Sequence, residues 1–207
     1  MTLEEAIAKI KPLDHNAMEI AQKRWDSIAK PLHSLGKLET LLIQIAGITG
    51  NAEVDLSRRG LIAMCADNGV VEEGVTQTGQ EVTAIVAENF LKYDTSVGVM
   101  CKQNHAEIFP VDMGMVTDTK VRTDHKIAYG TQNMTKGPAM TREQAVKGLE
   151  AGIDMVRELN DKGYRILATG EMGIGNTTTS SAVASVLLKQ PVEEMTRRGA
   201  GLTNGGL

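Results

Sequence analysis

The sequence predicts an α/β fold, in which a three-layer, Rossmann-like, mostly parallel sheet carries an N-terminal helical extension. Three short apolar runs support this prediction, at residues 61–66, 106–111 and 164–168. Each run ends in a turn that contains glycine, and segments with helical spacing separate the runs. This alternation is typical of βαβ units, whose strands are buried on both faces and therefore read as continuous apolar stretches.

The first 50 residues have helical periodicity. Apolar residues recur at i, i+4 and i+7 over residues 3–10, and helical spacing is also present over residues 16–29 and 38–48. We therefore expect residues 1–50 to form a helical segment. Residues 51–207 are expected to form an α/β nucleotide-binding domain.

The segments between the apolar runs supply further helices. Helical spacing is present at residues 85–91 and 97–101, and Thr141 and Gln144 are placed for a capping box before a longer helix. Pro110 is unfavourable for a central strand in the second run, because it lacks an N–H group. The face of the longer helix that we expect to be buried consists of Ala145, Leu149, Ile153, Val156 and Leu159.

Composition and charge exclude several classes of function. The net charge is −4 and aromatic residues make up only 3% of the chain, so the sequence predicts neither the basic surface nor the stacking platforms of a nucleic-acid-binding protein. No stretch of apolar residues is long enough for a membrane span, and the acidic start is unlike a secretory signal. Cys65 and Cys101 lack a CxxC spacing and are expected to be reduced, buried thiols in a cytoplasmic protein.

The most informative segment is GEMGIGNTTT at residues 170–179, after the third run. Its glycines permit a tight turn and a close approach of the backbone to a ligand. Asn176 or Thr177 is expected to cap the following helix, predicted over residues 178–188, whose free N–H groups favour an anion. Two interpretations stay open for residues 173–178: a phosphate cradle, or a plain glycine-rich turn between strand and helix.

Three acidic residues stand at the predicted carboxyl ends of the strands. Glu171, at the tip of the glycine-rich turn, is a candidate for binding a ribose hydroxyl, orienting a base or accepting a proton, and a capping role is the alternative. Asp67 and Asp112 are candidates for facing a sugar or a cationic ring, with a turn-forming role as the alternative. The four histidines have no metal-binding spacing, so no metal site is predicted.

Six stretches of the sequence form a recognisable series. They are RWDSIAKPLHSLGKLE (24–39), ADNGVVEEGVTQTGQEVT (66–83), VDMG (111–114), GTQNMTKGPAMT (130–141), GEMGIGNTT (170–178) and RGAGL (198–202). In these stretches, and in their order, the chain resembles the nicotinate-nucleotide–dimethylbenzimidazole phosphoribosyltransferase family. The resemblance covers nearly the whole chain, and GEMGIGNTT and GPAMT are its most specific parts.

The resemblance implies a reaction in cobalamin lower-ligand synthesis. Nicotinate mononucleotide would place its phosphate on residues 173–178, a nitrogen of 5,6-dimethylbenzimidazole would attack the anomeric carbon, and nicotinate would leave. The product would be α-ribazole phosphate. The resemblance further implies small-molecule substrates, a homodimer and no cofactor, nucleic acid or membrane.

The resemblance also implies the residues of the site. Glu171 is the candidate catalytic residue, the loop at residues 76–81 and Met172 would lie near the aromatic base, and Asp67, Glu171 and Asn176 would lie near the nucleotide. The predicted substrate-binding residues are Asp67, Gln77, Gln80, Met172, Gly173, Ile174, Gly175, Asn176, Thr177, Thr178, Gly199 and Gly201.

The chain departs from the family pattern in two respects. Family members are longer at the C-terminus, where the glutamate usually assigned as the general base and a phosphate-binding lysine lie, and Ala200 stands where Thr is more usual. The resemblance thus describes a truncated member, in which residues 1–50 are part of a small helical domain and the α/β nucleotide-binding domain of residues 51–207 is incomplete at its C-terminus. A non-catalytic module that binds the nucleotide or a free azole stays open as the alternative function, whereas a dinucleotide-binding domain lacks its GxGxxG sequence.

Overall fold

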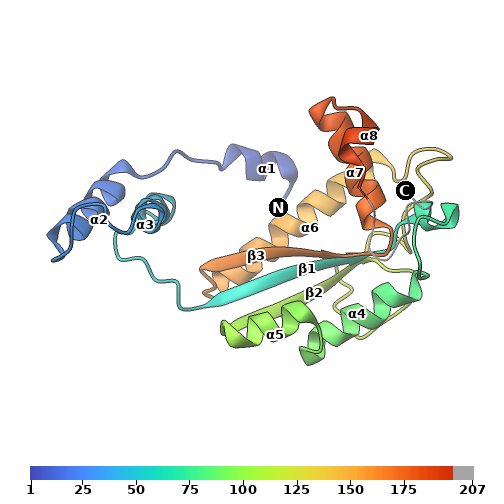
Figure 1. The fold of residues 1–207 in the computed structure, drawn as a ribbon, viewed down its shortest axis with the longest axis horizontal. Coiled ribbons are helices and arrows are strands. Elements are labelled where there is room, and N and C mark those ends of the chain that lie inside the picture. The colour runs from blue at the N-terminus through green and yellow to red at the C-terminus, as the bar shows by residue number, and fades with distance from the viewer. Residues whose placement is uncertain (198–207) are drawn as a thin grey trace. The chain divides into compact units, whose positions relative to one another are not determined.

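The computed structural model of the chain describes residues 1–197, and the chain forms two compact units. One unit comprises residues 2–57 and the other begins at Arg58. The first consists of helices, and the strands of the described chain lie in the second (Figure 1).

The helical unit contains α1 (Leu3–Ala8), α2 (His15–Ser27) and α3 (Lys37–Thr49). Asp14 begins α2 because its carboxylate accepts a hydrogen bond from the backbone N–H of Ala17 at 2.9 Å. The helices predicted for this segment are confirmed, with ends that differ by one or two residues. Close packing of α2 and α3 depends on small buried residues, which are Ala17, Ala21, Ala46 and Gly47.

The second unit is built on a sheet of three parallel strands. They are β1 (Arg59–Ala66), β2 (Ala106–Gly114) and β3 (Ile166–Met172), in the order β2-β1-β3. The order places β1, the first strand of the chain, in the centre, and each connection between strands passes through helices. The sheet confirms the predicted α/β class.

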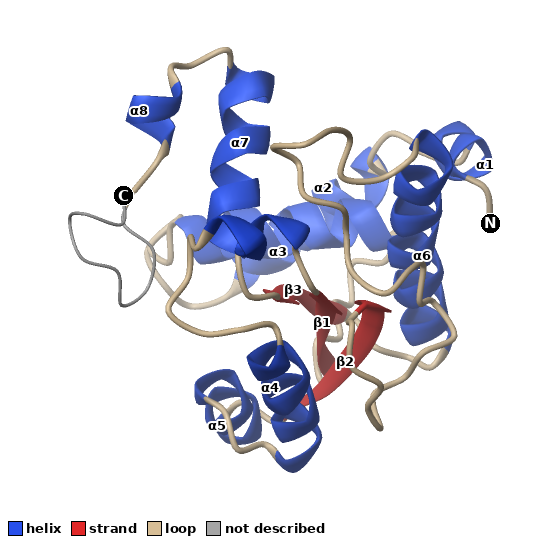
Figure 2. Cartoon of the chain, turned by 90° about the vertical axis from the view of Figure 1, so that its right-hand side faces the viewer, coloured by secondary structure: helices blue, strands red, loops and turns tan. Residues whose placement is uncertain are grey.

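Helices cover both faces of this sheet. The helices α4 (Glu81–Lys92) and α5 (Ser96–Gln103) lie on one face, and α6 (Arg142–Asp161) lies on the other (Figure 2). The three predicted layers are therefore present. The remaining elements are η1 (Gly69–Glu73), α7 (Asn176–Leu188) and α8 (Val192–Met195).

The central strand β1 contributes to two apolar cores because its side chains alternate between the faces. Cys65 is fully buried on the α4 side, where burial raises the pKa of its thiol to about 12, and Cys65 and Cys101 are both free, as predicted. One core contains Ala63, Cys65, Ala84, Ala87, Phe90, Met115 and Val121. The other contains Ile62, Val111, Met155, Leu159 and Tyr164.

The buried face predicted for α6 is largely wrong. The predicted capping box of Thr141 and Gln144 is present, but Leu149 and Val156 are 57% and 48% exposed. The buried residues are instead Ala151, Met155 and Leu159, which follow one another at intervals of four. The apolar stripe of α6 is broad, so its spacing alone does not determine which edge of the stripe faces the sheet.

Two details of the sheet bear on the sequence-based prediction: the place of Pro110 in β2 and the point at which β3 ends. Pro110 is tolerated because β2 is an outer strand of the described sheet. The third strand begins at Ile166 and continues to Met172, beyond the apolar run that predicted it, because Met64 and Cys65 of β1 continue the pairing. Glu171 therefore belongs to β3 and not to the following turn.

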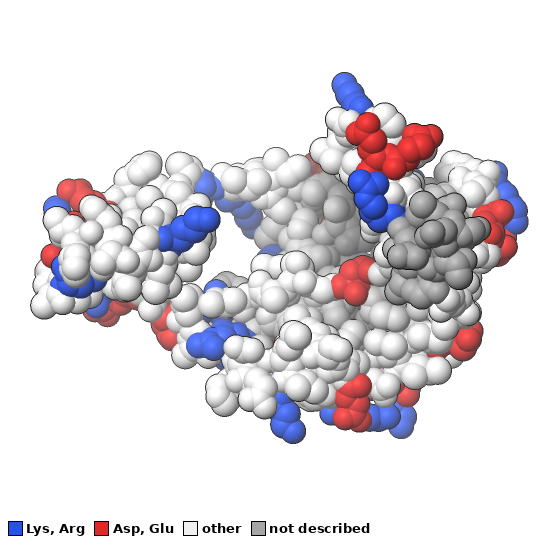
Figure 3. All heavy atoms as spheres, in the orientation of Figure 1, with Lys and Arg blue, Asp and Glu red and all other residues white. Residues whose placement is uncertain are grey.

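The described residues show the following distribution of charge and hydropathy. On the face shown in Figure 3, acidic and basic side chains are interspersed over the molecule's surface. No helix within residues 1–197 is both long enough and apolar enough to cross a bilayer.

Candidate functional site

The candidate site lies where the turns after β1 and β3 meet, at the carboxyl ends of the two strands. Gly173 is required there, because a Cβ atom at this position would overlap the carbonyl oxygen of Ala66. Gly175 has φ +87°, a left-handed conformation that turns the chain into α7. The glycines of this segment therefore bring the two turns into direct backbone contact.

Asn68 joins the two turns through its side chain. Its Nδ2 donates a hydrogen bond to the Ile174 carbonyl at 3.1 Å, and its Oδ1 accepts one from the Thr179 hydroxyl at 3.1 Å. Gln80 Nε2 donates to the Asn68 carbonyl at 3.1 Å, and the Ile174 N–H donates to the Thr83 hydroxyl at 3.0 Å. The glycine-rich turn is thus held by polar groups of the first turn and of α4.

Sequence reasoning missed Asn68 and Thr83 as residues of the site. Asn68 stands in the Asp-Asn-Gly sequence after the first strand, where an ordinary turn explains it equally well. Thr83 is fully buried, and its hydroxyl accepts a hydrogen bond from Ile174, which is 91 positions away in the sequence. The position of Asn68 at a strand end was the available signal, since ligands of open α/β sheets bind at that edge.

The start of α7 offers fewer free amides than the sequence predicts. Gly175 is the N-cap and supplies no side-chain hydrogen bond, so the predicted cap by Asn176 or Thr177 is wrong. The N–H groups of Asn176 and Thr178 donate to Gly173 and Gly175 at 3.0 and 3.2 Å. Within the described chain, the amides of Gly175 and Thr177 have no acceptor, and of these two residues Thr177 is exposed whereas Gly175 is buried.

Glu171 is held at the entrance to α7. Asn176 Nδ2 donates a hydrogen bond to Glu171 Oε2. Desolvation raises the pKa of Glu171 above its ordinary value, and the hydrogen bond from Asn176 acts in the opposite direction. A carboxyl group in this state is suited to taking up a proton near the start of α7.

Asp67 and Asp112 do not face a crevice. Both side chains are fully buried. Asp67 Oδ2 accepts a hydrogen bond from the Val116 N–H at 2.8 Å, and Asp112 Oδ1 accepts one from the Met115 N–H at 2.7 Å. Their role as a carboxylate pair facing a ligand is therefore corrected: they hold the long segment that follows β2.

A partly buried lysine completes this support. Lys126 Nζ lies 3.1 Å from Asp112 Oδ2 and 3.8 Å from the centroid of the Tyr129 ring. Burial away from water raises the pKa of Asp67 above its ordinary value, although hydrogen bonds from the Thr83 side chain and the Val116 N–H act in the opposite direction. Asp67 thus supports the site from beneath and has no exposed surface for a substrate.

The other predicted site residues are distributed around the two turns. Gln80 is the N-cap residue of α4 and contacts Asn68, and Gln77 lies in the loop before it. Met172 is partly buried and packs against the core between β1 and α4. Gly199 and Gly201 lie outside the described residues. Within residues 1–197, no group of three or more His, Cys, Asp or Glu is placed to hold a metal ion.

Comparison with known proteins gives the chain a family. A family model described as phosphoribosyltransferase matches residues 10–207. The chain belongs to this phosphoribosyltransferase family. A curated family member from Ruminiclostridium cellulolyticum, named nicotinate-nucleotide–dimethylbenzimidazole phosphoribosyltransferase, is 51% identical over the whole chain, and a Clostridium tetani protein of the same name is 46% identical over 99% of it.

The solved structures agree with this family. The crystal structure of CobT from Thermus thermophilus is similar to 92% of this chain, with a TM-score of 0.83 and 34% sequence identity. The chain spans 58% of that structure, and 59% and 57% of the Ruminiclostridium and Clostridium family members. The predicted family and the predicted fold are therefore both confirmed.

Proposed function

We propose that the chain is the nucleotide-binding part of a nicotinate-nucleotide–dimethylbenzimidazole phosphoribosyltransferase. Its activity would transfer phosphoribose from nicotinate mononucleotide to 5,6-dimethylbenzimidazole, which yields α-ribazole phosphate and nicotinate. The names of the family members support the substrates. The observation that carries the proposal is the turn that residues 173–175 form against Asn68, with two amides at the start of α7 that have no acceptor within the described chain.

The phosphate of the nucleotide is assigned to this turn. The unpaired amides of Gly175 and Thr177 would supply two donors, the hydroxyls of Thr177 and Thr178 would supply further ones, and the helix dipole favours the negative charge. Gly173 and Ile174 complete the turn beneath them. Clamping the phosphate fixes the distance between the anomeric carbon and the incoming base, which is the main contribution to rate that binding can make.

Glu171 is assigned to proton transfer. When a nitrogen of the azole bonds to the anomeric carbon, the bond to the nicotinate nitrogen breaks and its electron pair leaves with nicotinate. The proton of the azole N–H must then be removed, and a carboxylate with a raised pKa at the edge of the turn is suited to accept it. Met172, Gln77 and Gln80 are assigned to the side of the aromatic base.

The remaining assignments rest on the resemblance. They are a cytoplasmic homodimer that works without a cofactor, with Gly199 and Gly201 near the nucleotide. Gel filtration with light scattering tests the dimer. A molecular mass near that of one chain would contradict it.

Release of nicotinate tests the activity directly. The 207-residue chain is incubated with nicotinate mononucleotide and dimethylbenzimidazole, and nicotinate is measured by chromatography. Backbone NMR with the mononucleotide alone is expected to shift the amides of Gly175 and Thr177. Binding without release, retained in Glu171→Gln, would favour the non-catalytic binding module, and unchanged Gly175 and Thr177 amides would contradict the assigned phosphate site.

A further inference from the structure

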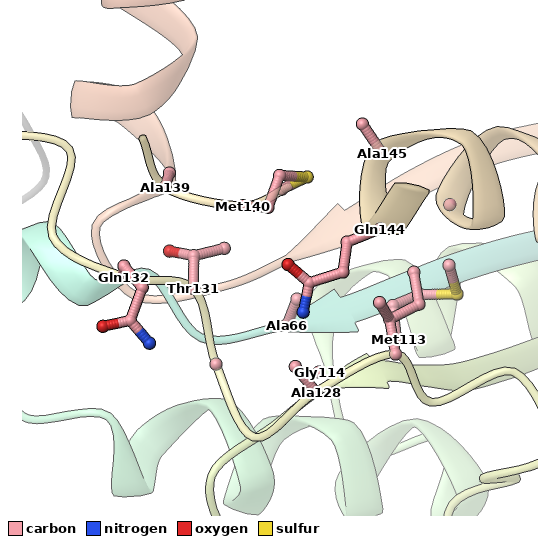
Figure 4. Close-up of a pocket in the computed structure, with 13 residues that line it drawn as sticks. Ala66, Met113, Gly114, Ala128, Thr131, Gln132, Ala139, Met140, Gln144 and Ala145 are labelled. Carbon is pink, nitrogen blue, oxygen red and sulfur yellow. The ribbon is translucent and has the colours of Figure 1, made fainter. Parts of the chain in front are cut away.

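A cavity lies beside the candidate site and shares none of its predicted substrate-binding residues. It has a volume of about 240 Å³ and lies at the carboxyl ends of β1 and β2, below the first turns of α6 (Figure 4). Its apolar walls come from Met113, Ile127 and Met140 together with small residues such as Ala66 and Ala128. We propose that this cavity is a binding site for a neutral aromatic molecule of one or two rings that carries one hydrogen-bond acceptor.

The walls of the cavity are fixed by backbone hydrogen bonds, so the cavity exists before a ligand enters. The N–H groups of Gly130 and Gln132 donate to the carbonyls of Gly114 and Ala139 at 3.0 and 2.8 Å. Thr131 is held from both sides, because its N–H donates to the Asp67 carbonyl and its hydroxyl accepts from the Gly69 N–H, both at 3.0 Å. A preformed, mostly apolar cavity is the usual form of a small-molecule site.

The size and charge of the cavity define the ligand. An apolar protein cavity of about 150 Å³ is sufficient for benzene, so the larger cavity here accepts a substituted ring or two fused rings. None of the lining residues is charged, and an ion would lose its hydration without compensation. Met113 and Met140 supply flexible thioethers, which make favourable contacts with aromatic rings.

Gln144 supplies the polar contact. Its Oε1 accepts a hydrogen bond from the Thr141 N–H at 2.9 Å, as part of the capping box at the start of α6. The amide is therefore oriented with its nitrogen away from the capping box; this nitrogen has no hydrogen-bond partner within residues 1–197, and in Figure 4 it points toward Ala66. A fixed N–H donor in an apolar cavity selects a ligand with an acceptor at the matching position.

Two pairs of variants test the assignment. Gly148 lines the cavity from α6, and a Cβ atom there would meet only Ile127 Cδ1 at 3.5 Å, so Gly148→Ala leaves the cavity open and Gly148→Leu fills it. Gln144→Glu keeps the acceptor of the capping box and removes the donor. The probes are isoquinoline, which has a ring acceptor, and indole, which has the same size and no such acceptor.

Methyl NMR of the methionines in the 207-residue chain reads out binding, at a pH where isoquinoline is neutral. Isoquinoline is expected to shift the Met113 and Met140 signals saturably in the native chain and in Gly148→Ala, and to leave them unchanged in Gly148→Leu. Gln144→Glu is expected to weaken isoquinoline by about two- to tenfold, with little effect on indole.

Three results would overturn the site: no saturable shift at Met113 and Met140, an undiminished shift in Gly148→Leu, or equal isoquinoline affinity in Gln144→Glu. Met172 reports separately on the glycine-rich turn. A shift at Met172 alone would contradict the cavity and leave the proposed function intact, whereas loss of the nucleotide-induced shifts at Gly175 and Thr177 would contradict the proposed function and leave the cavity intact.

Discussion

The helices α6 and α7 are both rich in apolar residues but are held in place by different interactions. Met155 and Leu159 of α6 are fully buried against the sheet, whereas Ser185 is the one buried residue described for α7. Val186 and Leu187 of α7 are 76% and 75% exposed. The position of α6 therefore depends on an apolar core, and that of the α7 N-terminus depends on the hydrogen bonds around Asn68.

The largest expected effect comes from the core beneath α6. Met155→Ala removes a fully buried side chain and leaves a cavity, so we expect it to lower the free energy of unfolding by about 2–5 kcal/mol. Val156→Ala, at the adjacent exposed position, is the matched control and should change stability by less than about 1 kcal/mol. Urea denaturation measures both. Equal losses would mean that α6 faces the sheet with the other edge of its stripe.

Asn68→Ala is expected to act more locally. It removes the side-chain donor of the Ile174 carbonyl and one of the two acceptors of the Thr179 hydroxyl, which keeps the Asn176 carbonyl, at a cost of about 1–2 kcal/mol. Hydrogen exchange should become faster at the start of α7 and stay unchanged in α6. Thr179→Val removes the hydrogen bond to Asn68 together with the one that the same hydroxyl donates to the Asn176 carbonyl at 3.0 Å, so it should speed exchange in the same amides while the bond from Asn68 to Ile174 remains. Uniform acceleration in both helices would show that the turn and the core unfold together.

A pH series separates ionic from apolar support of α6. Hydrogen bonds from Arg122 and then Lys162 lower the pKa of Glu158 to about 2 in the folded chain, below its ordinary value of 4.5. The contribution of Glu158 is therefore fully present above pH 4.5 and is lost as the pH falls toward 2. Because the pair is partly exposed, Glu158→Gln should cost about 0.5–1 kcal/mol near neutrality and progressively less in acid. A difference that is independent of pH would contradict this role.

The smallest effect is expected on the exposed face of α7. Val186→Ser removes little packing from the described chain, so the free energy of unfolding should change by less than about 0.5 kcal/mol. Thermal denaturation at several protein concentrations measures it. A loss as large as that of Met155→Ala would show that this face is covered in solution.

The difference between the two helices also shows what the sequence could predict. The apolar runs predicted the three strands but not the end of β3. Glu171 and Met172 pair with β1 through their backbone groups, and this pairing does not depend on apolar side chains. The capping box of α6 is local and was predicted correctly, whereas the choice of Met155 over Leu149 depends on where the sheet lies. The hydrogen bonds of Asn68 connect residues 106 and 111 positions apart, beyond any local pattern.

Pro110 and the backbone of Arg122 have a consequence for association between molecules. Pro110 offers no N–H group, and on the same outer strand the Asp112 N–H already donates to the Arg122 carbonyl at 2.8 Å. The edge of the sheet at β2 is therefore poorly suited to pairing with a strand from another molecule. Of the two outer strands described, β3 has no proline along Ile166–Met172, so recruitment of an additional strand, whether from another molecule or in an aggregate, would be directed to that side.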